Sequence, residues 1–97
     1  MKKYKQPEYL KRAGYRLSLF LDAMRINQKD LAKGCGFTES QISNWINGRQ
    51  RIGLDAMITM SDTYGIPFEY IFKAKLAPLD TKVRKFVESK PRDKWAR

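Results

Sequence analysis

Residues 27–47, which read NQKDLAKGCGFTESQISNWIN, contain two helix starts in close succession and decide the fold. Asn27 is suited to cap the first of the two helices. The run from Thr38 to Gln41 matches the S/T-x-x-E/Q capping box, in which two side chains satisfy backbone N–H groups reciprocally. Gly36 lies between the two starts and can adopt the positive φ that ends a helix. The stretch therefore predicts two short helices, at 28–34 and 39–46, joined by a tight turn.

Apolar spacing defines the inner face of the second helix. Ile42 and Trp45 fall four and seven residues after Thr38, on one side of the helix. Trp45 is interpreted as a core residue, the alternative being a platform on which a base stacks. Ala32 is small enough to lie where the two helix axes cross. The pair has the form of a helix-turn-helix unit, in which the second helix enters the DNA major groove.

The remaining residues of the second helix form an outer face that is short, polar and rich in amides. A solvent face more often carries long Lys and Glu side chains, whereas amides and hydroxyls suit the edges of DNA bases. We expect base reading from Glu39, Ser40, Gln41, Ser43 and Asn44. Glu39 has two open interpretations, because its carboxylate could accept a hydrogen bond from cytosine or could favour the positive end of the helix dipole.

Helical spacing continues on both sides of this unit. Apolar residues from Leu10 to Met24 recur every three or four positions and predict a helix over about 7–25. Asn47-Gly48 opens a loop, after which helices are expected from Leu54 to about Tyr64 and over 68–72. The expected fold is all-α: a five-helix DNA-binding domain at 9–73, a basic arm at 1–8, and a basic tail at 74–97 with a short sixth helix. The apolar stripe of that tail has no evident cover, so we expect dimerisation there and at nearby aromatic residues: Leu79, Val83, Phe86, Val87, Phe68 and Phe72.

Charge is concentrated at the two ends of the chain. The 97 residues carry 20 Lys and Arg against 10 Asp and Glu, a formal net charge of +10. Bases outnumber acids five to one in residues 1–12, seven to six in residues 13–73, and eight to three in residues 74–97. The ends either keep the chain in solution or add phosphate contacts to a site built on the neutral middle. Nucleic acid is the expected partner of such a chain.

The composition argues against catalysis. Histidine is absent, and Cys35 is the single cysteine, so neither an imidazole proton shuttle nor an intramolecular disulfide can form. Neither a catalytic triad nor a glycine-rich phosphate loop can be assembled from the sequence. We expect no enzymatic activity, no metal, no cofactor and no membrane segment, and a cytoplasmic location.

In these motifs, residues 14–72 resemble the helix-turn-helix family of Cro and lambda repressor proteins, also called the xenobiotic-response-element type. The resemblance implies that Glu39, Ser40 and Asn44 read bases. It also implies phosphate contacts from the starts of the two helices, at Asn27, Gln28 and Thr38, and from the loop beyond them, at Asn47, Arg49 and Arg51. Gln50 lies within that basic loop and is expected to contact phosphate with it.

Two functions remain open at this point. The first is a sequence-specific regulator of transcription, a small phage-type or prokaryotic repressor that binds an inverted repeat of double-stranded DNA as a homodimer. The alternative keeps the fold but makes the chain a protein-interaction module, such as the antitoxin of a toxin–antitoxin pair.

Overall fold

A computed structural model describes residues 6–91, and these residues fold into helices without a strand. The described part contains six helices: α1 (Gln6–Met24), α2 (Gln28–Cys35), α3 (Glu39–Ile46), α4 (Leu54–Tyr64), α5 (Phe68–Lys73) and α6 (Thr81–Glu88). The all-α prediction is confirmed: the five helices predicted with bounds are present with their ends within about two residues of expectation, and a sixth follows in the tail. None of the helices in residues 6–91 is both long and apolar enough to cross a membrane.

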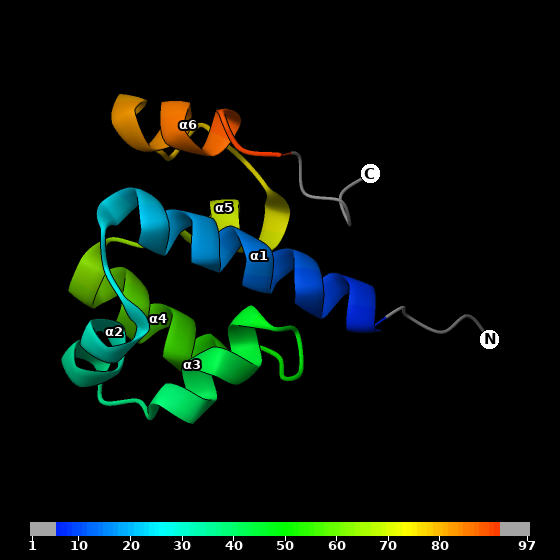
Figure 1. Ribbon diagram of the computed structural model, residues 1–97, viewed down its shortest axis with the longest axis vertical. Helices are drawn as coiled ribbons and strands as arrows, with labels where there is room; N and C mark the ends of the chain where they lie inside the picture. The colour runs from blue at the N-terminus through cyan, green and yellow to red at the C-terminus, as the bar shows by residue number, and fades with distance from the viewer. Residues whose placement is uncertain (1–5, 92–97) are drawn as a thin grey trace.

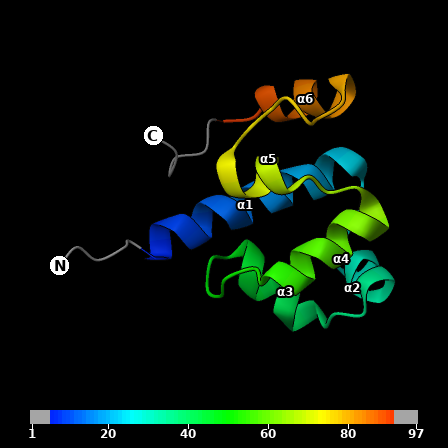
Figure 2. The same ribbon diagram turned by 180° about the vertical axis from the view of Figure 1, so that it is seen from behind.

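The long helix α1 lies at the centre of the molecule, between α6 and a group of three helices. In Figures 1 and 2, α2, α3 and α4 lie on one side of α1, and α6 lies on the opposite side. α1 packs against α3, α5 and α6, and α2 packs against α3 and α4. The helix-turn-helix pair is therefore supported by two other helices: α1 packs against α3, and α4 packs against α2.

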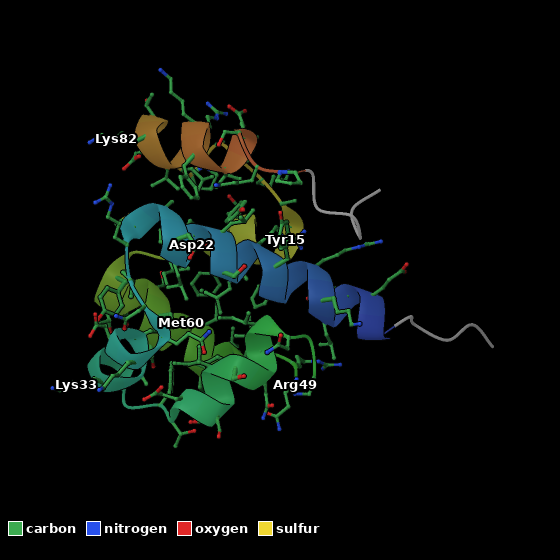
Figure 3. The ribbon with its side chains drawn as sticks, in the orientation of Figure 1. Tyr15, Asp22, Lys33, Arg49, Met60 and Lys82 are labelled. Atoms are coloured by element: carbon green, nitrogen blue, oxygen red, sulfur yellow. The ribbon has the colours of Figure 1, made fainter. Side chains whose placement is uncertain are left out.

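One hydrophobic core joins these helices. It is built from fully buried side chains contributed by five of them, among them Leu17, Leu31, Ile42, Met57 and Ile71. Figure 3 shows Met60, which is also fully buried, in the space between α1 and the helices below it. Burying a large apolar side chain contributes about 1.5–3 kcal/mol, so this cluster is the main force that holds α3 in place.

The ends of the short helices follow local sequence signals. Asn27 caps α2, since its side-chain oxygen accepts a hydrogen bond from the Asp30 N–H at 2.8 Å. Gly36 ends α2 at a φ of 77°, the left-handed conformation that glycine adopts without a steric penalty. Ala32 is buried in the core, and α2 packs against α3. α1 ends at Met24, and the next residue, Arg25, has a φ of 59°.

The C-terminal helix corrects one expectation. The apolar stripe of residues 79–87 is largely covered by the chain itself: α6 packs on α1, and both Val83 of α6 and Leu79, just before α6, are buried in the core. Among the other expected dimerisation residues, Phe68, Phe72 and Val87 are half-buried and pack against the same core. Phe86 is also half-buried, and the Lys90 ammonium lies 4.7 Å from the centroid of its ring. The Tyr15 hydroxyl also donates a hydrogen bond to the Pro91 carbonyl at 3.0 Å, which joins the chain after α6 to α1. Leu79 and Val83 are thus part of the core, and most of this stripe is covered within the chain.

Candidate nucleic-acid interface

The start of α3 is built by a reciprocal cap. The Gln41 N–H donates to Thr38 Oγ1 at 3.1 Å, and the Thr38 N–H donates to Gln41 Oε1 at 2.9 Å. The predicted capping box is confirmed. The Gln41 oxygen is engaged in the cap, so its Nε2 is the atom of the amide that can still donate to a ligand. Thr38 and Gln41 are both exposed, so the first turn of α3 presents its polar groups to solvent.

The inner face of α3 orients the helix. Ile42 is fully buried and Trp45 nearly so, and the Phe37 ring meets the Trp45 ring edge-on with 5.0 Å between their centroids. Trp45 is therefore a core residue, as expected. The opposite side of α3 carries the predicted base-reading residues, of which Glu39, Ser40 and Gln41 are exposed and Ser43 and Asn44 half-buried.

A glycine on α1 sets how close α1 and α3 lie. A Cβ atom at Gly14 would lie within van der Waals overlap of the Trp45 carbonyl oxygen and 2.6 Å from the Ile46 carbonyl oxygen. These are backbone atoms, which cannot swing aside. Gly14 was not among the residues predicted from the sequence, although the small pair Ala13-Gly14, flanked by the large residues Arg12 and Tyr15, is a signal of close helix approach. Gly14 thus positions the last turn of α3.

The loop after α3 folds back on the helix. The Arg49 and Gln50 N–H groups both donate to the Asn44 carbonyl, at 2.8 and 3.2 Å. Gly48 has a φ of 71° and is buried against Lys11 of α1, so the turn needs glycine both for its conformation and for space. The Asn-Gly turn signal is confirmed. The turn brings Arg49 next to the side of α3 that carries the predicted base-reading residues, which we call the recognition face.

Polar side chains at the end of α3 form a small network. Arg49 Nε donates to Asn44 Oδ1 at 3.0 Å, and Arg49 Nη2 lies 3.4 Å from Ser43 Oγ. Asn47 Nδ2 donates to the Ser43 carbonyl at 2.8 Å and approaches its hydroxyl at 3.3 Å. Two residues expected to read bases are thereby linked to two expected to contact phosphate.

The remaining expected phosphate contacts lie at exposed helix starts and in the loop. Asn27 and Gln28 are at the start of α2, Thr38 is at the start of α3, and Gln50 and Arg51 follow the network in the loop. Helix N-termini favour anions because their first N–H groups are unpaired and the helix dipole is positive there. Residues 1–5 and 92–97, with most of the lysines and arginines of the expected arms, lie outside the described residues.

Arg16 is a second residue that the sequence analysis missed. Its side chain is buried, and its Nε donates to the Ile71 carbonyl at 2.8 Å. Through this bond α1 satisfies a carbonyl of α5, which makes Arg16 a structural residue. On α2, half-buried Cys35 has its thiol pKa raised by burial, with a hydrogen bond to Thr63 acting in the opposite direction. A raised pKa lowers the thiolate fraction and hence the reactivity of Cys35.

These features define a class of protein: a small helix-turn-helix domain whose second helix presents polar side chains outward. The helix-turn-helix family model matches residues 18–71, more than half of the chain. The chain belongs to the helix-turn-helix family of the Cro/C1 type, a DNA-binding family. The predicted resemblance is confirmed. Searches of curated proteins and of solved structures found no match to this chain.

Proposed function

We propose that this protein is a sequence-specific regulator of transcription, a small repressor that reads double-stranded DNA with α3. The observation that carries the proposal is the two-sided character of α3. Ile42 and Trp45 anchor one side in the core, while the other side presents hydroxyl, amide and carboxylate groups. Groups of this kind, on a helix that fits the major groove, discriminate base pairs by their hydrogen-bonding patterns.

Residues around α3 would hold the domain on the DNA backbone. Asn27, Gln28 and Thr38 contribute helix starts and polar side chains, and Gln50 and Arg51 extend the surface beyond the loop. Contacts of this kind set register and orientation without reading sequence. Glu39 is the acidic residue of the face and would accept a hydrogen bond from cytosine.

We further propose that the protein binds an inverted repeat as a homodimer. One domain of this size covers only about 600–1,000 Å² of interface, and two domains related by two-fold symmetry place their recognition helices ~34 Å apart. The first turns of α4 offer a contact surface, because Leu54 and Ile58 lie one helical turn apart with 64% and 41% of their surface exposed. Light scattering should show a dimer that Leu54→Glu converts to a monomer, and a wild-type monomer at high concentration would exclude this proposal.

The function is tested by the Asn44→Ala variant. Removing the amide should cost ~1–3 kcal/mol of binding free energy on the preferred duplex and relax selection at one base position per half-site. Binding to random duplex DNA should hardly change, because that binding depends on phosphate contacts. Fluorescence anisotropy with a selected duplex and a random duplex measures both quantities.

Thermal unfolding provides the control for this test, since half-buried Asn44 lies outside the core and the variant should keep the wild-type Tm. Equal losses on both duplexes would show that α3 does not read sequence. A wild-type protein that binds neither duplex, but co-purifies with a stoichiometric small protein, would favour the antitoxin alternative.

A further inference from the structure

The last turn of α3 and the loop after it hold one arginine against the recognition face. Arg49 was expected to clamp phosphate from the loop. Its backbone N–H donates to the Asn44 carbonyl at 2.8 Å, and its Nε donates to Asn44 Oδ1 at 3.0 Å. In Figure 3 Arg49 lies at the C-terminal end of α3. The guanidinium is thus bent back along the helix.

The chemistry of the pair determines which way the Asn44 amide faces. A guanidinium has only donors, so the amide atom that meets Arg49 must be the oxygen. One acceptor site of the Asn44 oxygen is therefore occupied by Arg49, while the Nδ2 group, which can only donate, is not engaged by it. An asparagine reads adenine by accepting from N6 while donating to N7, and this requires that its oxygen be available to the base.

Ser43 adds a third group of the same polarity. Its hydroxyl oxygen lies 3.4 Å from Arg49 Nη2 and 3.3 Å from Asn47 Nδ2, two groups that can only donate. The hydroxyl oxygen accepts from these neighbours, so the Ser43 hydroxyl hydrogen points elsewhere and is itself available as a donor. The end of α3 consequently offers hydrogen-bond donors from three neighbouring side chains.

We propose that Asn44 and Arg49 act as one base-reading unit that selects guanine, with Arg49 determining specificity instead of clamping the backbone. Guanine shows two acceptors, N7 and O6, in the major groove, whereas adenine shows one acceptor and one donor. A surface of donors alone fits the first pattern and leaves the adenine N6 group without a partner. This inference rests on the proposed function, because it concerns the same face of α3.

Selection from random duplexes tests the inference with three proteins: wild type, Arg49→Lys and Arg49→Ala. Wild-type protein should select a guanine in each half-site. Arg49→Lys keeps the charge but lacks the paired N–H donors of the guanidinium. Its preference for that guanine should therefore be about 5- to 150-fold lower than that of wild type. Arg49→Ala frees Asn44 Oδ1 and should shift selection at the same position toward adenine. Arg84→Lys, on the exposed side of α6 and across α1 from α3, is the matched control and should keep the wild-type preference.

A modified duplex gives a second readout. Replacing the selected guanine with 7-deazaguanine removes N7, which should weaken wild-type binding but leave Arg49→Ala unaffected. The inference is overturned if Arg49→Lys selects like wild type and Arg49→Ala weakens all duplexes equally with a smaller salt dependence, the behaviour of a phosphate clamp. Selection of a site without guanine also overturns it, while leaving the proposed function intact. A wild-type protein that enriches no duplex overturns the proposed function as well, so the two failures are distinguishable.

Discussion

At the scale of single residues, Gly14 has the largest structural effect for its size. Gly14→Ala should lower the free energy of unfolding by about 1–3 kcal/mol, because the added methyl would meet the Trp45 and Ile46 carbonyls. Moving α3 away from α1 should also weaken binding to the preferred duplex. Urea denaturation and anisotropy measure the two effects.

Gly34→Ala is the matched control for this substitution. Gly34 also lies within a helix, but a Cβ there would meet the Tyr64 side chain and not backbone atoms. The Tyr64 hydroxyl, which donates to the Asp30 carbonyl at 3.2 Å, would have to shift, so this variant should be destabilised less than Gly14→Ala. If Gly14→Ala is equally stable, the close approach of α1 and α3 does not depend on glycine.

At the scale of helices, the capping box of α3 is the local device that starts the recognition helix. Thr38→Ala removes the hydroxyl that accepts from the Gln41 N–H and should cost about 1 kcal/mol of stability. Thr38→Ser keeps a hydroxyl in the same place and should recover most of that loss. Thermal unfolding of the three proteins compares them directly, and equal destabilisation by serine and alanine would contradict the role of the hydroxyl.

At the scale of the whole molecule, exposed basic residues lie both on α6 and in the loop after α3, on opposite sides of α1. α6 carries Lys82, Arg84 and Lys85, all exposed, and lies across α1 from α3 (Figures 1 and 2). Because exposed charges further apart than about 8–10 Å are largely screened at physiological salt, these residues should contribute little to DNA binding. Lys82→Glu should leave affinity within about twofold of wild type and should not alter the salt dependence of binding.

Arg51→Glu, in the loop beside the recognition helix, is the comparison for that variant. It should weaken binding to selected and random duplexes alike and reduce the slope of log K against log salt. Anisotropy titrations at several salt concentrations give both slopes. A large effect of Lys82→Glu would mean that α6 also faces the nucleic acid.

The sequence by itself determined the helices and their ends, because caps and helical spacing act between residues at most four positions apart. Asn27, Gly36 and the Thr38–Gln41 box mark helix ends that the structure confirms. The same local pattern separated the buried side of α3 from its polar side, and with it most of the candidate site.

Only the tertiary structure decided which surfaces meet. The cover that α1 provides for Leu79 and Val83, the close approach at Gly14 and the bond from Arg16 to the Ile71 carbonyl each join segments distant in sequence. Periodicity shows that a helix has an apolar face, but not which helix covers it. The contact between Arg49 and Asn44 depended on the path of a loop, and loop paths follow from backbone bonds and available space that no residue pattern specifies.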